Sequence, residues 1–172
     1  MTVPPAIGAF VAKYFSRGLL IDTNLLLLYL TGRFDRRLIG TFKRTQHYTP
    51  EDFDLLARFI ARFRWTFITP HILAEVSNLA QGIKGPQRSG FLRTFVQALT
   101  PAKEHWIAKN TILSSPLFVM LGATDTGFIL GAPQPEFLVL TDDFRAAHAL
   151  ETARRAVINF NHLRQLNWLA RP

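Results

Sequence analysis

Five acidic residues stand in or beside apolar stretches of the sequence, where an unpaired carboxylate costs on the order of several kcal/mol to desolvate. They are Asp22, Glu75, Asp125, Asp142 and Asp143. Carboxylates that lie close together repel one another unless a cation neutralises them. The chain contains no cysteine, so an all-oxygen site of this kind favours Mg²⁺ or Mn²⁺. One or two such ions could activate water and stabilise the in-line transfer of a phosphoryl group.

Two of the predicted strands end directly at these acids. Residues 19–22 begin as a buried strand, and the apolar run that follows is expected to form a helix ending at Gly32. Asp142 and Asp143 follow a second predicted strand, over residues 136–141. Ligands of parallel α/β sheets bind at the carboxyl ends of the strands. We therefore expect these acids at the ligand-binding edge of a sheet.

The other two acids are expected near the starts of helices. Glu75 lies one turn into a helix that begins at Thr69 and Pro70, behind a short strand over 66–69, so its side chain can point back to the same edge. Asp125 is placed at the start of another predicted helix, where the positive end of the helix dipole favours a carboxylate.

Each acid also has an explanation that requires no chemistry. Asp22 and Asp125 could cap the helices that follow them, and Glu75 could pair with an arginine on a helix surface. One of Asp142 and Asp143 is expected to be an ordinary acid at a helix start. These alternatives lose weight together, because all five acids are expected at one edge of one sheet.

The chain as a whole alternates short apolar strands with helices, which indicates an α/β domain with a parallel sheet and helices on both faces. Besides the segments above, we predict a helix that Thr49 caps, a helix over residues 91–99 and a strand over 157–160. The segment 82–90 is expected to be a glycine-rich basic loop, and 102–113 is ambiguous. A length of 172 residues is typical of one domain.

The charge of the chain indicates an anionic partner. It has 20 lysine and arginine residues against 12 aspartate and glutamate residues, for a net charge of +8, and most of the basic residues are arginines. Arginine pairs with phosphate through a planar fork, so this balance favours nucleic acid, with a basic protein that lacks such a partner as the alternative. Seven basic residues are candidates for contacts with a nucleic-acid backbone, although each could serve only to solubilise the surface: Arg33, Arg36, Arg37, Lys43, Arg44, Lys84 and Arg88.

Several classes of protein are disfavoured. No apolar run reaches the ~20 residues that span a bilayer, and residues 1–18 lack the basic start and cleavage site of a signal peptide. The absence of cysteine excludes disulfides and thiolate metal sites. We therefore expect a cytoplasmic protein with no membrane partner.

Four segments, in this order, resemble the motifs of the PIN-domain nucleases. The first is LLIDTNLLLLYL, which contains Asp22, and the second is ITPHILAEVSNL, which contains Glu75. The third is LGATDTGFIL with Asp125, and the fourth is LVLTDDF with Thr141 and Asp143. The motifs fall within residues 19–160 of a single domain spanning 1–172, with 1–18 and 161–172 as terminal extensions.

This resemblance implies a three-layer α/β/α sandwich with a central, mainly parallel sheet. It also implies dependence on Mg²⁺ or Mn²⁺ and endonuclease action, mostly on RNA. Asp22, Glu75, Asp125 and Asp143 would then be the catalytic, metal-binding acids, with Asp142 competing with Asp143 for the metal. Thr141 would support the site. Many small bacterial members of the family are toxins of toxin–antitoxin pairs, so an antitoxin protein and a second copy of the chain are candidate partners.

Asn24 follows Asp22 by two residues, so it is expected either to orient that acid or a metal-bound water, or to act as a turn residue. Two other functions share the same acids. The first is an RNA-binding module that does not cut, which the four intact motif acids disfavour. The second is a metal-dependent phosphatase acting on a small phosphoester, which would not need the basic surface. A domain that binds only other proteins would leave the acids at the strand ends unexplained.

Overall fold

A parallel sheet forms the centre of the structure, which is a computed structural model that describes residues 5–131 and 137–169. Its strands are β1 (Leu19–Ile21), β2 (Thr66–Ile68), β3 (Lys103–Glu104), β4 (Leu138–Thr141) and β5 (Val157–Asn159). They lie in the order β3-β2-β1-β4-β5, and every pairing is parallel. The predicted strand over 136–141 therefore begins at Leu138, and residue 136 lies outside the described residues.

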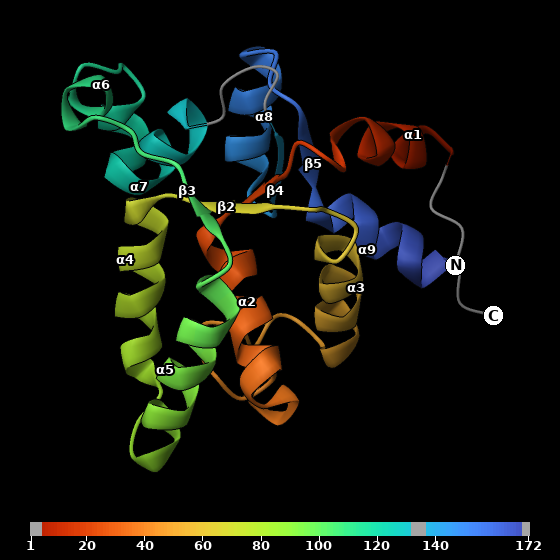
Figure 1. The fold of residues 1–172 in the computed structure, drawn as a ribbon, viewed down its shortest axis with the longest axis vertical. Coiled ribbons are helices and arrows are strands. Elements are labelled where there is room, and N and C mark those ends of the chain that lie inside the picture. Colours follow the sequence, from red (N-terminus) through yellow and green to blue (C-terminus); the bar gives the residue numbers. More distant parts are fainter. Residues whose placement is uncertain (1–4, 132–136, 170–172) are drawn as a thin grey trace.

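Helices flank this sheet. They are α1 (Pro5–Tyr14), α2 (Thr23–Phe34), α3 (Pro50–Ile60), α4 (Pro70–Leu79), α5 (Pro86–Leu99), α6 (Lys109–Leu113), α7 (Phe118–Leu130), α8 (Phe144–Thr152) and α9 (Phe160–Leu169), with short 3-10 helices η1 (Arg36–Leu38) and η2 (Ala80–Gly82). In Figure 1, α2, α3, α4 and α5 lie below the strands in the view, whereas α6, α7 and α8 lie above them. The predicted α/β class, with a parallel sheet between two helical layers, is confirmed.

The two central strands are apolar because both of their faces are covered. Leu19 and Leu20 in β1 and Leu138, Val139 and Leu140 in β4 are fully buried. β1 and β4 are paired along their whole shared length, and continuous apolar runs of this kind are typical of parallel strands with helices on both faces. The carboxyl ends of β1 and β4 consequently lie side by side.

Local signals set most of the helix starts. Thr49 forms a capping box with Asp52 at the start of α3, and the hydroxyl of Thr69 accepts a hydrogen bond from the backbone N–H of Ile72 at the start of α4. A proline follows each threonine in the first turn, where its missing N–H costs nothing. These two predicted helix starts are therefore confirmed.

The sequence prediction is wrong in the segment between α4 and α5. The expected loop over 82–90 contains the first turns of α5, which begins at Pro86 after Gly85 with φ of +63°. A left-handed glycine followed by proline makes the turn and starts the helix in two residues.

The ambiguous segment 102–113 contains both β3 and α6. The N-terminal helix α1 is not predicted by the patterns above. α7 is kinked at Gly122, whose φ is +75°. This kink divides α7 into two helices, and the second contains Asp125 near its start, as the sequence predicts. No helix among the described residues has the length and apolar character needed to cross a membrane.

α2 continues past its predicted end at Gly32 and lies against α3. A Cβ atom at Gly32 would overlap the ring of Phe53, which is a buried residue of α3. Glycine at this position therefore permits the close approach of the helix that begins at the acidic edge to the helix beside it.

We expect Gly32→Ala to lower the free energy of unfolding by about 1–3 kcal/mol, because the added methyl group overpacks the contact with the Phe53 ring. Urea unfolding of the two purified proteins measures the change. Gly8→Ala is the matched control, since Gly8 also lies within a helix but has open space around it. That variant should be unchanged or gain up to about 1 kcal/mol. Equal effects of the two substitutions would contradict the packing argument.

Candidate functional site

Asp22 lies at the end of the central strand β1 and is 9% exposed. One carboxylate oxygen accepts a hydrogen bond from the backbone N–H of Leu25, 2.9 Å away, and so caps α2. The other accepts a hydrogen bond from the backbone N–H of Asp142, also at 2.9 Å. The same side chain therefore caps α2, which is the role that Asp22 would have without any chemistry. It also joins the end of β1 to the end of β4.

The surroundings of Asp22 disfavour its charged form. Burial is the main cause that raises the pKa of Asp22 well above its ordinary value, and the negative charge of Asp142 raises it further. Hydrogen bonds from Thr141 and from the backbone N–H groups of Leu25 and Asp142 act in the opposite direction but do not cancel the shift. Two acids from different motifs thus interact directly at this edge.

Asp142 is held from several sides. Its carboxylate accepts hydrogen bonds from the hydroxyl of Tyr48 and, at 3.4 Å, from the amide of Asn24. Its backbone carbonyl accepts a hydrogen bond of 2.8 Å from the amide of Asn161. Asn24 therefore contacts an acid of the fourth motif rather than Asp22.

Tyr48 is a site residue that the sequence patterns do not identify. Its hydroxyl donates to Asp142, and burial followed by the charge of Asp142 raises the pKa of the phenol. A tyrosine at the end of a loop-like segment carries no motif, so no local pattern indicates this role. Asn161 could have been identified from the sequence, because it follows the strand predicted over 157–160 and so lies at the same edge of the sheet as the acids.

An ion pair behind Tyr48 fixes its position. The guanidinium of Arg164 in α9 lies 2.9 Å from a carboxylate oxygen of Asp52 in α3, whose side chain is almost completely buried. The same guanidinium lies over the ring of Tyr48, 5.6 Å from its centroid. It also donates a hydrogen bond of 3.2 Å to Asn161. α3 and α9 together therefore support the residues that hold Asp142.

Glu75 and Asp125 form the second part of the acidic edge. A carboxylate oxygen of Glu75 in α4 accepts a hydrogen bond of 2.8 Å from the hydroxyl of Thr23, the residue next to Asp22. Partial burial is the main cause that raises the pKa of Asp125 in α7, followed by the charges of Glu75 and of Asp143. The carboxylate of Asp125 makes no hydrogen bond or ion pair with another described residue. Asp125 is therefore repelled by Glu75 and Asp143, and no contact with another described residue offsets this repulsion.

Asp143 is the cap of α8. One of its carboxylate oxygens accepts hydrogen bonds from the backbone N–H groups of Arg145 and Ala146, at 2.6 and 3.1 Å. Its own N–H donates to the hydroxyl of Thr141, which is fully buried. Asp143 is thus the helix-start acid that was expected of one member of the pair. Its charge also acts on Asp125, so Asp142 and Asp143 each interact with another acid of this edge.

The structure therefore brings the predicted acids together in two coupled groups. Asp22 interacts with Asp142, and Asp125 interacts with Glu75 and Asp143. Asp142 of the first group and Asp143 of the second are adjacent in the chain. Thr23, the residue after Asp22, donates a hydrogen bond to Glu75. In the part of the chain that the structure describes, no three acidic or histidine side chains are gathered into a ready metal-binding group.

The seven basic candidates separate into two sets. Arg33 donates to the hydroxyl of Tyr29, and Arg36 and Arg37 form ion pairs with Asp54 and Asp35. The remaining four make no ion pair or hydrogen bond through their side chains with the described residues: Lys43, Arg44, Lys84 and Arg88. Arg33 and these four residues therefore have guanidinium or ammonium groups that form no ion pair with an acid among the described residues.

The comparisons with known proteins neither support nor contradict a family for this chain. No model of a known protein family matches the sequence. A search of curated proteins found no match either.

We expect the free energy of unfolding, measured with urea in the presence of a chelator, to fall as the pH rises from about 4 through the raised pKa of Asp22. In the unfolded chain an aspartate releases its proton at about pH 3.9, whereas the native state keeps the proton of Asp22 to a higher pH. Because the native state binds more protons over this interval, raising the pH removes stability.

Asp142→Asn should flatten this part of the pH profile. The substitution removes the charge that raises the pKa of Asp22 but leaves a side-chain oxygen to accept from Tyr48. Comparison with the unsubstituted protein cancels the opposite contribution of Asp35, whose pKa the neighbouring Arg37 lowers. Glu151→Gln on the exposed end of α8 is the control for the loss of one negative charge. Identical profiles for Asp142→Asn and the control would contradict the coupling.

Proposed function

We propose that this chain is a metal-dependent endoribonuclease of the PIN-domain type, which hydrolyses RNA phosphodiester bonds with Mg²⁺ or Mn²⁺ as its cofactor. The observation that carries this proposal is the repulsion among acids at the carboxyl edge of the sheet. The pKa of Asp22 is raised by burial and by Asp142, and that of Asp125 by burial and by Glu75 and Asp143. A fold that keeps such acids together is typical of a site that binds a cation.

The chemistry of the side chains fits a hard divalent cation. The candidate ligands are all carboxylates, drawn from Asp22, Glu75, Asp125 and Asp143, with Asp142 as the alternative to Asp143. Oxygen ligands of this kind suit Mg²⁺ and Mn²⁺. A bound ion would supply positive charge that neutralises these carboxylates and stabilises charge on phosphoryl oxygens.

The protein's own residues would orient these ligands. The backbone N–H groups of Leu25 and Asp142 keep Asp22 in one orientation, and Thr23 does the same for Glu75. Tyr48 and Asn24 hold the carboxylate of Asp142 between them. Ligands that are positioned before the ion arrives lose less entropy on binding it.

Basic side chains without an acidic partner, elsewhere on the described chain, support a polyanionic substrate. Carboxylates alone would repel an RNA backbone, so the approach of the strand requires cations outside the acidic edge. Lys43, Arg44, Lys84 and Arg88 have no acidic partner among the described residues and are our candidates for backbone contacts. By resemblance to small bacterial PIN proteins, we also propose a toxin role in the cytoplasm, with an antitoxin or a second copy of the chain as partners.

A second candidate function is that of an RNA-binding module that does not cut. The hydrogen bonds that the acids make within the protein favour this function. Both carboxylate oxygens of Asp22 accept hydrogen bonds from backbone N–H groups, and one carboxylate oxygen of Asp143 caps α8. Carboxylates engaged in this way have fewer lone pairs left for an ion.

We expect the purified protein to cleave labelled total RNA with Mg²⁺ or Mn²⁺ and to be inactive with a chelator. Asp125→Asn should reduce cleavage by about 100-fold or more, the usual cost of losing a group that acts on developing charge. Because Asp125 makes no contact that the substitution would break, and repels Glu75 and Asp143, this variant should remain at least as stable as the unsubstituted protein. Higher stability with lower activity is the signature of a site selected for function.

Glu151→Gln is the matched control for this experiment, since it removes an exposed carboxylate far along α8 from the acidic edge. It should cleave RNA normally. Binding of RNA without cleavage in either metal would replace the nuclease with the RNA-binding module. Equal cleavage by Asp125→Asn and the control would remove Asp125 from the catalytic residues.

We also expect Mn²⁺ to raise the midpoint of thermal unfolding in the absence of RNA. A ligand that binds only the native state adds about 2.7 kcal/mol of stability at a concentration 100 times its dissociation constant. Relief of the repulsion around Asp22 and Asp125 is the physical source of this gain. Sodium chloride at the same ionic strength provides the control. A shift of equal size with sodium chloride, or one retained in full by Asp125→Asn, would show that the ion does not bind at these acids.

A further inference from the structure

A pocket with a volume of about 560 Å³ lies beside the C-terminal end of α4. One wall comes from residues 38–44, and the other comes from α4, η2 and the start of α5. The volume falls within the range of about 300–1,000 Å³ that is usual for small-molecule sites. The proposed catalytic acids do not line this pocket.

Part of the lining is apolar. Leu38 and Phe42 contribute from one wall, and Leu79 and Ile83 contribute from the other. Phe42 and Ile83 are buried residues of the core. Leu38 and Leu79 are half-buried, so their remaining apolar surface could pack against a face of a flat ring system.

The rest of the lining is polar and basic, and no acid lines the pocket. Asn78 and Gln87 each offer an amide that both donates and accepts hydrogen bonds. Lys43, Arg44 and Lys84 supply three positive charges, and none of them pairs with an acid among the described residues. Apolar walls, two amides and unpaired cations match the three parts of a nucleotide, which are a flat base, its polar edge and a phosphate.

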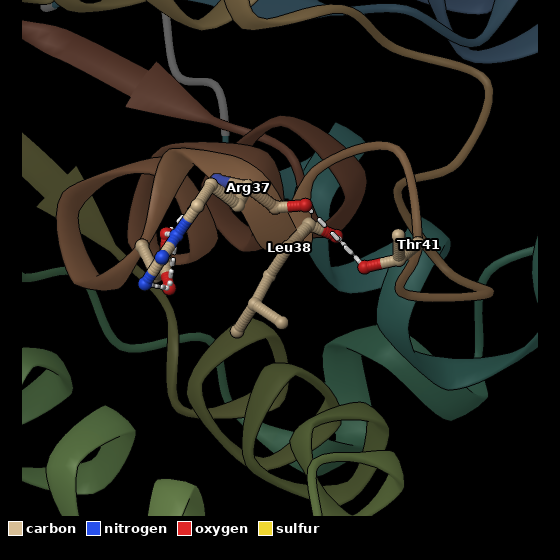
Figure 2. Close-up of polar contacts among 4 residues, drawn as sticks. Arg37, Leu38 and Thr41 are labelled. Atoms are coloured by element: carbon tan, nitrogen blue, oxygen red, sulfur yellow. Dashed lines mark hydrogen bonds and ion pairs between the residues drawn. The ribbon is translucent and has the colours of Figure 1, made fainter.

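The walls are held in place without a ligand. A Cβ atom at Gly82 would lie 2.8 Å from the ring of Phe42, so glycine there allows the ring to rest against the end of η2. The hydroxyl of Thr41 donates to the carbonyls of Arg37 and Leu38, at 3.4 Å each, as Figure 2 shows. In the same view, Leu38 points away from Thr41 toward the helix below it. The buried hydroxyl of Thr45 donates to the carbonyl of Ile39 at 2.9 Å and so closes the segment.

The pocket lies one helical turn from the acidic edge. Asn78 follows Glu75 by three residues in α4, a spacing that puts side chains next to each other on one helix face, with Cβ atoms about 5–6 Å apart. Glu75 in turn accepts the hydrogen bond from Thr23, beside Asp22. A strand that occupies the pocket can therefore continue directly toward the acids.

We propose that this pocket binds one nucleotide of the RNA strand, and that Asn78 and Gln87 read the edge of its base while Lys43, Arg44 and Lys84 contact phosphates. This inference rests on the proposed ribonuclease function and deepens it. The pocket would select the position of cleavage by fixing one base a short distance from the acidic edge. Reading a single unpaired base by hydrogen bonds is the usual way in which proteins recognise RNA sequence.

The test measures binding alone, by fluorescence anisotropy with the full-length protein and a chelator, so that no cleavage occurs. The probes are short labelled oligoribonucleotides of the four homopolymer sequences, together with the four free nucleoside monophosphates. We expect the protein to prefer one homopolymer by about fivefold or more, the lower limit for a good pair of hydrogen bonds to a base. Asn78→Ala and Gln87→Ala should reduce that preference and leave the dependence on salt unchanged.

Arg44→Ala should weaken the binding of all four homopolymers alike. The slope of log K against log salt concentration should become smaller in magnitude by about 0.7, the value for one lost phosphate contact with a single strand. Arg58→Ala is its matched control, an exposed arginine on α3 that does not line the pocket, and should change neither quantity. Urea unfolding of each variant verifies that the protein is folded.

Three outcomes would overturn the proposal. Amide variants that keep the full homopolymer preference would mean that the pocket does not read a base. A monophosphate that binds as tightly as the oligonucleotide would assign the pocket to a free nucleotide. Absence of binding to any homopolymer at low salt would exclude the RNA strand as occupant. Because no metal or cleavage is involved, a failure of the nuclease proposal alone would leave the expected base preference in place.

Discussion

The carboxylate of Asp22 lies buried at the end of the central strand, and two backbone N–H groups donate to it, those of Leu25 and Asp142. The hydrogen bond from Leu25 caps α2, and the one from Asp142 connects the turn between β1 and α2 to the turn between β4 and α8. A typical intramolecular hydrogen bond contributes about 0.5–1.5 kcal/mol to stability. The positions of Thr23, Asn24 and Asp142 follow from this connection, because each of these residues adjoins one end of it.

The same arrangement concentrates negative charge. Burial and the charge of Asp142 raise the pKa of Asp22. Burial and the charges of Glu75 and Asp143 raise the pKa of Asp125. Hydrogen bonds from Tyr48 and Asn24 to Asp142 offset part of the repulsion. What remains unfavourable in the protein alone would be relieved by a cation, which is the reason to associate this edge with metal-dependent chemistry.

The segment between α2 and α3 connects the acidic edge to the basic pocket. At one end, Tyr48 reaches Asp142, and the guanidinium of Arg164 lies over the Tyr48 ring. Near its middle, Phe42 rests against Gly82, and Lys43 and Arg44 line the pocket. The placement of this segment therefore determines both how Asp142 is oriented and where the unpaired cations lie, so the two sites are not structurally independent.

Local chemistry explains how much of the fold could be predicted from the sequence. The apolar runs predict β1 and β4, and threonine followed by proline predicts the starts of α3 and α4, because burial and capping act within a few neighbouring residues. β3 could not be predicted. It consists of Lys103 and Glu104, both exposed, and it exists because its backbone pairs with β2. Backbone pairing leaves no pattern in the side chains.

The candidate site divides in the same way. The sequence by itself determined that Asp22, Asp142 and Asp143 follow strands, since the position of a residue after an apolar run is a local property. Only the tertiary structure decided that Tyr48 donates to Asp142, 94 residues away, and that Arg164 pairs with Asp52, 112 residues away. Nor could the sequence show which cations are already paired with acids and which remain unpaired around a pocket. Contacts of this kind depend on which helices pack together, and no local pattern of residue types specifies that choice.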